Sequence, residues 1–162
     1  MKNLVMTMAA LVTLASCGVY AGPQKIEEHP GMMKAMSAHD YADTRTRLKT
    51  ILADKGLTLF SEIDHGSGAD AVDMDLTPST LFVFGDPKAG TPLMQSDEMM
   101  AFELPLRILV QKRDDGVWLI YRNAKAWSDE YDLIGLNDNL ARIDDAVTDI
   151  VETVISEPEE QA

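Results

Sequence analysis

The feature that most constrains the fold of this chain is a short apolar run that ends abruptly. Residues Leu81 to Phe84 are typical of a buried strand, and the Gly-Asp-Pro that follows turns the chain. A second corner, Gly90-Thr91-Pro92, precedes a short helical pattern. A loop rich in glycine and proline is rigid and shaped. We therefore predict that residues 85–95 form a binding loop at the end of a central strand.

Hydrophobic spacing on both sides of this run predicts one α+β domain over residues 32–156. Tyr41 to Gly56 has helical spacing, with Asp40 at the helix start. Strand-like segments are residues 32–37, 57–63, 79–84, 104–112 and 117–121, the last two joined by a tight turn at Asp115-Gly116. We expect a tether at 23–31, a flexible glycine-rich loop at 64–71 and short helices at 97–102 and 124–131. This order predicts an antiparallel sheet with helices on one face.

The last helix, expected over residues 137–155, is amphipathic. Its apolar stripe requires burial, for which the protein's own sheet is the simplest place: Leu140, Ile143, Val147, Ile150, Val151 and Val154. Its other face is acidic, with Arg142 as the single basic residue, and an acidic tail follows at residues 157–162. We interpret the acidic residues as a solvated helix face and tail.

The acidic balance of the chain excludes some partners. The sequence has 14 Lys and Arg residues against 27 Asp and Glu residues, a net charge of −13. Nucleic acid requires a basic face, so no nucleic-acid partner is expected. The same charge disfavours direct contact with anionic lipid, so contact with a membrane is expected only through a lipid anchor.

Residues 1–22 are typical of an export leader. Their apolar stretch, Leu4 to Ala15, is too short to span a bilayer. Leu14-Ala15-Ser16-Cys17 resembles a bacterial lipoprotein box, in which Cys17 carries the lipid, and Gly18 resembles the outer-membrane sorting pattern. We expect an exported, periplasmic lipoprotein anchored in the outer membrane. The alternative is a soluble periplasmic or secreted protein cleaved after Ala21.

Several segments between Tyr41 and Trp127 carry a resemblance to a known family. They are Lys55-Gly56, Glu62-Ile63-Asp64-His65, Leu76-Thr-Pro-Ser-Thr-Leu81, Phe84-Gly-Asp-Pro-Lys-Ala-Gly-Thr-Pro-Leu-Met94 and Leu104-Pro105-Leu106. The chain resembles the bacterial and archaeal domain-of-unknown-function family 302 (DUF302). The resemblance implies a β-α-β4-α sandwich similar to the TATA-binding-protein-like architecture, often dimeric, so a homodimer is an expected partner. It implies no activity.

Two glycine patterns invite comparison with nucleotide sites but lack required parts. Gly85 to Gly90 is G-x-x-x-x-G, yet Thr91 stands where a phosphate-binding loop needs Lys, and Pro92 removes a backbone N–H. Gly66 to Ala71 is G-x-G-x-x-A, but a dinucleotide site requires a parallel βαβ unit. No cofactor is therefore expected.

The binding hypothesis assigns a small ligand or an envelope protein to the 85–95 segment. The expected ligand-binding residues are Gly85, Asp86, Pro87, Lys88, Gly90, Thr91, Pro92 and Met94, with Arg107 and Tyr121 as polar groups on neighbouring strands. We expect five large apolar residues beside the segment, as a ligand pocket, a dimer interface or plain packing: Met94, Met99, Met100, Phe102 and Trp127.

Two other functions stay open. His65 is the best candidate for acid–base catalysis, with Lys88 or Arg107 stabilising charge, although it also fits an exposed loop histidine. Alternatively, thioethers and imidazoles at the start of the domain suit copper(I), or the methionines are core filler: His29, Met32, Met36 and His39. Because the 85–95 segment has few titratable groups, we rank a non-catalytic binding module above both.

Overall fold

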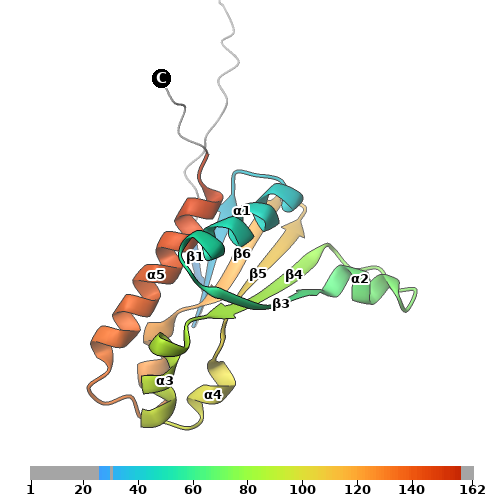
Figure 1. Ribbon diagram of the computed structural model, residues 1–162. Helices are drawn as coiled ribbons and strands as arrows, with labels where there is room; N and C mark the ends of the chain where they lie inside the picture. The colour runs from blue at the N-terminus through green and yellow to red at the C-terminus, as the bar shows by residue number, and fades with distance from the viewer. Residues whose placement is uncertain (1–25, 30, 158–162) are drawn as a thin grey trace, which may run out of the picture.

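The protein folds around one antiparallel sheet, shown in Figure 1. The computed structural model describes residues 26–29 and 31–157. The strands are β1 (Ile26–His29), β2 (Met32–Ser37), β3 (Thr58–Asp64), β4 (Ser79–Gly85), β5 (Leu106–Arg113) and β6 (Gly116–Arg122), in the spatial order β1-β2-β6-β5-β4-β3. The helices are α1 (Tyr41–Asp54), α2 (His65–Asp70), α3 (Pro87–Ser96), α4 (Met100–Glu103) and α5 (Asn137–Ile155), with a 3₁₀ helix η1 (Ala124–Asp129).

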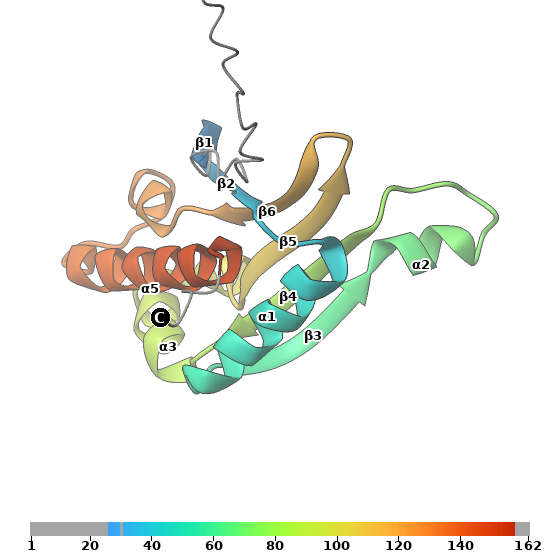
Figure 2. The same cartoon turned by 90° about the horizontal axis from the view of Figure 1, so that it is seen from above.

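Alternation along the strands buries one face of the central strands of the sheet. Its inner side chains have no exposed surface: Ala35, Phe82, Phe84, Ile108, Val110 and Leu119. Helices α1 and α5 pack side by side on this face (Figure 2). The six residues of the predicted α5 stripe are all buried. The α+β class, the antiparallel sheet and the helices on one face are therefore as predicted.

The cap residues explain the bounds of α1. The carboxylate of Asp40 accepts a hydrogen bond from the N–H of Asp43 at 2.9 Å, which satisfies a donor that the first helical turn leaves free. At the other end Gly56 adopts a φ of +69°, a left-handed conformation that side chains disfavour. Between the two, Thr44, Leu48 and Leu52 are buried.

Two short segments differ from the expectation. Ile26–His29, expected to be part of a tether, pairs with β2 as the edge strand β1. Residues 65–70, expected to be part of a flexible loop, form α2, because the Asp64 carboxylate accepts a hydrogen bond from the N–H of Ser67 at 3.0 Å and caps the helix. In Figure 1, α2 projects away from the sheet, at the end opposite to α3.

The predicted export leader falls on residues that the structure does not describe. Cys17, the rest of the leader and residues 158–162 of the acidic tail lie outside the described residues. Among the helices of residues 26–29 and 31–157, none is both long enough and apolar enough to cross a membrane.

Candidate functional site

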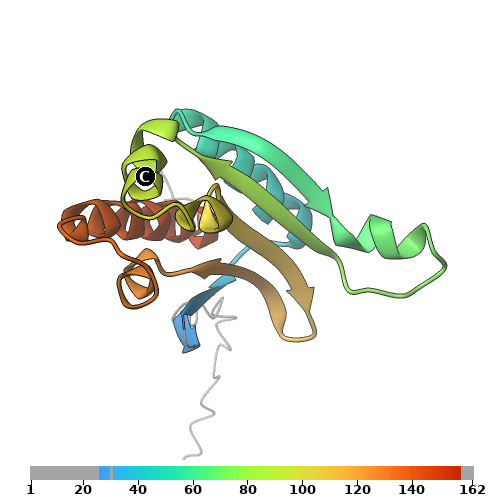
Figure 3. The same cartoon turned by 90° about the horizontal axis from the view of Figure 1, so that it is seen from below.

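A hollow of about 270 Å³ lies where α3 meets one end of the sheet. Figure 3 shows α3 beside α5 at this end. Asp86 is the charged residue in the lining, and the remaining lining residues are apolar: Phe60, Gly85, Pro87, Ala89, Gly90, Met94, Leu104, Pro105, Leu106 and Ile143. Small-molecule sites typically measure about 300–1,000 Å³ and are mostly apolar, so this hollow lies just below the lower end of that range.

One wall of the hollow is the helix α3, in place of the expected loop. The carboxylate of Asp86 accepts a hydrogen bond from the N–H of Lys88 at 2.9 Å, and Pro87 occupies the first helical position, where its missing N–H costs nothing. Pro87, Gly90 and Met94 then fall on one helix face, toward the hollow. The prediction of a loop was therefore wrong in secondary structure, although the same segment lines the hollow.

A Cβ atom at either of two lining glycines would contact another residue of the lining. A Cβ atom on Gly85 would lie 3.8 Å from Cβ of Pro105 and 3.9 Å from Cε2 of Phe60, in ordinary contact with two lining residues. A Cβ atom on Gly90 would lie 3.1 Å from Cδ1 of Leu104, which is tighter than ordinary contact. The close approach of α3 to Leu104 therefore favours glycine at position 90, whereas position 85 has room for a Cβ atom.

A second hollow, of about 320 Å³, adjoins the first on the side of α5. Asp86, Ala89, Leu106 and Ile143 line both hollows. The second hollow is also lined by Leu57, Phe84, Lys88, Asn139, Arg142, Ala146, Val147 and Ile150. Its polar groups, Lys88, Asn139 and Arg142, distinguish it from the first hollow.

The structure does not bring Arg107 and Tyr121 to either hollow. They lie on adjacent strands but on opposite faces, because Tyr121 pairs with Ile108, the residue after Arg107. Tyr121 is only 5 % exposed beneath α5, where burial raises the pKa of its hydroxyl despite a hydrogen bond with Thr148.

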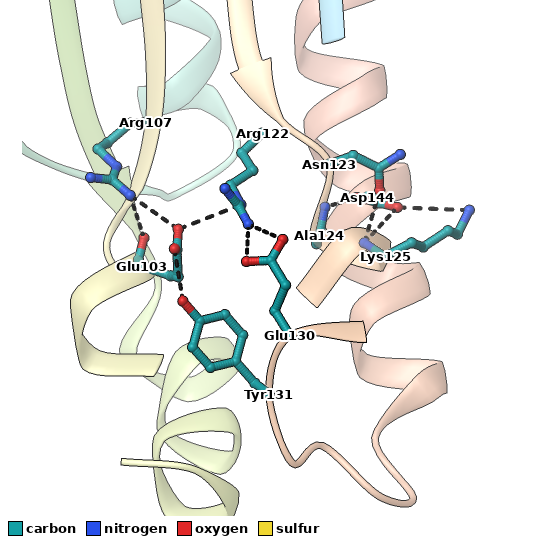
Figure 4. Close-up of polar contacts among 9 residues, drawn as sticks. All are labelled: Glu103, Arg107, Arg122, Asn123, Ala124, Lys125, Glu130, Tyr131 and Asp144. Atoms are coloured by element: carbon teal, nitrogen blue, oxygen red, sulfur yellow. Dashed lines mark hydrogen bonds and ion pairs between the residues drawn. The ribbon is translucent and has the colours of Figure 1, made fainter. Parts of the chain in front are cut away.

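Arg107 instead belongs to a charged cluster around Glu103, drawn in Figure 4. The Glu103 carboxylate accepts hydrogen bonds from Nη2 of Arg107 at 3.2 Å and from the Tyr131 hydroxyl at 2.9 Å, while Nε of Arg122 lies 3.6 Å away. Glu130 pairs with Arg122 on the exposed side. Since 8 % of the Glu103 side chain is exposed, these charges interact more strongly than surface pairs do. The cluster joins α4, β5, β6 and the segment after η1.

A second buried carboxylate in Figure 4 holds η1 in place. Asp144, on α5, accepts hydrogen bonds from the N–H groups of Ala124 and Lys125 at the start of η1. The ammonium group of Lys125 lies 3.8 Å from the same carboxylate. Sequence reasoning assigned Asp144 to a solvated acidic face, but its carboxylate fastens η1 to α5.

Comparison with known families decides what kind of domain this is. The family model described as "Domain of unknown function DUF302" matches residues 33–154, which include the sheet from β2 onward and nearly all of α5. The chain belongs to the DUF302 family. The family resemblance predicted from the sequence is thereby confirmed.

Relatives of this DUF302 chain are longer proteins. "Fluoride-specific ion channel FluC 1" of Brucella suis biovar 1 (strain 1330) is 34% identical over 112 residues, covering 68% of this chain and 44% of the relative. The protein of the same name from Brucella abortus biovar 1 (strain 9-941) is also 34% identical, over 41% of its length. The chain therefore spans less than half the length of these curated relatives.

A solved structure shares the DUF302 fold. The crystal structure of an uncharacterized conserved DUF302 protein from Bacillus stearothermophilus superposes with a TM-score of 0.70, covering 78% of this chain and 99% of the other. At 12% sequence identity the likeness shows a common fold alone.

His65 of the DUF302 domain is exposed at the first position of α2. The neighbouring Asp64 carboxylate bonds the N–H of Ser67 and lies 3.7 Å from Nη1 of Arg45, and these contacts lower its pKa, the Ser67 N–H first. Asp64 therefore does not orient the His65 ring. Since α2 and α3 lie at opposite ends of the sheet, the fold also keeps His65 apart from Lys88 (Figure 1).

Of the proposed copper ligands, Met32, Met36 and His39 do not converge in the DUF302 domain. Met32 and Met36 share the outer face of β2, whereas Nε2 of His39 lies 2.8 Å from the carbonyl oxygen of Ser156, at the end of α5 on the inner face. The side chain of His29 lies outside the described residues. Within the described part of the chain, no group of three or more His, Cys, Asp and Glu side chains is placed to hold a metal ion.

The methionine and aromatic residues expected beside the segment are divided among the hollow, the core and the surface. Met94 lines the first hollow. Met100 and Trp127 are buried in the core, whereas Met99 and Phe102 are exposed on and before α4. Plain packing therefore accounts for Met100 and Trp127. Met94 is the member of the group that lines the hollow.

Sequence reasoning missed the part of the site that comes from segments distant in the chain. Phe60 lies on β3, Leu104 and Pro105 precede β5, and Asn139 and Arg142 lie on α5. One signal pointed to Arg142, because it is the single basic residue of an acidic helix.

Proposed function

We propose that this DUF302 protein is a non-catalytic module of the cell envelope that binds a small ligand in the two adjoining hollows beside α3. The observation that carries the proposal is the apolar first hollow, continuous with a second hollow that contains polar groups. This combination of an apolar cavity with a few polar side chains is typical of ligand sites. The sequence of residues 1–22 supports export, with a lipid on Cys17 as the preferred anchor.

The few titratable groups at the site favour binding over catalysis. Charged side chains in the two linings are Asp86, Lys88 and Arg142. The Asp86 carboxylate serves as the helix cap of α3, and Arg stays protonated in proteins, so neither group is suited to proton transfer.

The name of the Brucella relatives describes a fluoride channel. We do not assign that activity to this chain, because the match covers less than half of each relative. In these relatives, the segment similar to this chain forms part of a protein that is named as an ion channel. A membrane protein is therefore a second candidate partner. A homodimer is a further proposed partner, on the family resemblance alone.

Native mass spectrometry of the full chain, purified under mild conditions from its own envelope, tests ligand binding. We expect an additional mass that the variant Ala89→Trp loses, because Ala89 lines both hollows and an indole would fill their junction. The matched control is Ala42→Trp, which alters an exposed alanine in the first turn of α1. A bare wild-type polypeptide, or an adduct that survives Ala89→Trp, would contradict the proposal.

A further inference from the structure

The first hollow is suited to a hydrocarbon chain. Ten of its eleven lining residues are apolar. The eleventh, Asp86, directs its carboxylate to the N–H of Lys88 in its own helix. A polar group placed in this hollow would lose its hydrogen bonds to water without gaining others, whereas an apolar chain would gain from leaving water.

The second hollow has two cations that pair with no carboxylate of the described residues. The described part of the chain contains twelve Lys and Arg residues, and eight of them bind a carboxylate, an aromatic ring or backbone carbonyls of another element: Arg45, Arg47, Lys49, Lys55, Arg107, Arg113, Arg122 and Lys125. The other four described cations are Lys34, Lys88, Lys112 and Arg142. Two of these four, Lys88 and Arg142, line the same hollow.

The charge at this hollow is opposite in sign to that of the whole protein. Lys88 and Arg142 with Asp86 give the lining a net charge of +1, in a chain of net charge −13. The Nε of Arg142 donates to the carbonyl oxygen of Asp138 at 3.2 Å, within its own helix, which leaves the terminal guanidinium nitrogens for a ligand. Asn139, three residues before Arg142 on α5, also lines this hollow and adds an amide that can donate as well.

We propose that the ligand is a single-chain amphiphile with an anionic head group, of the fatty-acid class. Its hydrocarbon chain occupies the first hollow, and its carboxylate lies in the second, between Lys88 and Arg142. This assignment rests on the proposed function and names the chemistry of its ligand. The small shared residue Ala89 stands where the chain passes from one hollow to the other.

Isothermal titration calorimetry with four probes below their micellar concentrations tests this assignment. The probes are dodecanoate, dodecanol, dodecylamine and butyrate. We expect dodecanoate to bind more tightly than the neutral or cationic twelve-carbon probe, and butyrate to bind far more weakly because it lacks the chain. In the double variant Lys88→Gln/Arg142→Gln, the affinity for dodecanoate should fall about three- to tenfold, as expected for two partly exposed charge pairs.

The matched control is Lys34→Gln/Lys112→Gln, which removes the other two of the four described cations named above and should leave the affinity unchanged. Equal affinity for dodecanoate and dodecanol, preference for dodecylamine, or equal loss in both double variants would overturn the anionic head group. If Ala89→Trp still abolished binding of those probes, the proposed binding site would stand and only the ligand class would fall. Dodecanoate binding that Ala89→Trp left intact, or no binding of any probe together with a bare protein in native mass spectrometry, would overturn both.

Discussion

The hydroxyl of Tyr131 donates a hydrogen bond of 2.9 Å to the buried carboxylate of Glu103. Arg107 and Arg122 approach the same carboxylate from β5 and β6. One short helix, two strands and the segment after η1 therefore meet at a single acidic side chain (Figure 4). Because a buried charge is tolerated only with partners of this kind, the cluster predicts where the fold is sensitive to small changes.

Glu103→Gln should destabilise the protein by about 1.5–3 kcal/mol, the range for hydrogen bonds to charged groups. The amide keeps the shape of the side chain but leaves Arg107 and Arg122 facing a neutral group. Urea denaturation followed by circular dichroism measures the loss. The control is Glu130→Gln, since Glu130 also pairs with Arg122 but is exposed, and it should cost no more than about 1 kcal/mol. Equal effects of the two variants would contradict the structural role of the buried carboxylate.

The same hydrogen bond predicts the behaviour of Tyr131 at high pH. Its bond to Glu103 raises the pKa of Tyr131, because the phenolate would face a carboxylate. A raised pKa in the folded state means that this stabilisation is present below the unfolded pKa near 10.0 and is lost as pH rises through the folded value. Ultraviolet titration should show the pKa of Tyr131 fall in Glu103→Gln. Burial raises the pKa of Tyr121, and this raised pKa should persist in that variant.

The pair Arg45–Glu62 predicts a loss of stability in acid. The hydrogen bond from Arg45, at 2.6 Å, lowers the pKa of Glu62, with the charge of Lys49 acting in the same direction. Stability from this group is therefore present above its unfolded pKa near 4.5 and is lost as pH falls through the lower folded value. Because the pair is partly exposed, the effect should not exceed about 1 kcal/mol. Urea denaturation between neutral and acid pH should show a smaller loss in Glu62→Gln than in wild type. If the loss of stability between neutral and acid pH were the same in Glu62→Gln as in wild type, the pair would contribute nothing.

Asp144→Ala should release η1 from α5. It leaves the N–H groups of Ala124 and Lys125 without their shared acceptor, at a cost of about 1–3 kcal/mol. The neighbouring Asp145 is exposed, so Asp145→Ala should stay within about 0.5 kcal/mol of wild type. Denaturation followed by tryptophan fluorescence suits the test, because Trp127 is buried within η1. Similar losses in both variants would mean that the acidic face of α5 is solvated throughout, as the sequence had indicated.

Local patterns explain why much of the fold could be predicted. Helix α1 has both its spacing and its caps within the sequence, from Asp40 to Gly56. The stripe of α5 and the β5–β6 hairpin, in which Arg113 pairs with Gly116, are equally local. In each case residues a few positions apart determine the structure, so these elements could be predicted from the sequence alone.

The binding site depended on contacts that the sequence does not display. Phe60, Gly85 and Ile143 line one hollow although they are far apart in the chain, and only the sheet order and the packing of α5 bring them together. Arg107 and Tyr121 were placed at the site because their strands are neighbours. Their opposite faces follow from the register of β5 and β6, in which Ile108 pairs with Tyr121.

Helix α3 illustrates a signal that was present and was given too little weight. Gly90, Thr91 and Pro92 are poor helix formers, which favoured a loop. However, Asp86 followed by Pro87 is a strong start signal for a helix. The buried Leu93 and Gly90, packed against Leu104, supply tertiary contacts that outweigh the weak propensity.

Asp86→Ala tests whether this capped helix forms. Loss of the bond to the Lys88 N–H should cost about 0.5–2 kcal/mol, whereas Asp86→Ser can restore the acceptor and should keep most of the stability. Thermal denaturation measures the cost, and backbone chemical shifts of residues 87–96 report on helix content directly. Because α3 forms a wall of both hollows, the alanine variant should also weaken ligand binding more than the serine variant does. A variant with unchanged stability and unchanged shifts would show that the Asp86 cap contributes nothing to α3.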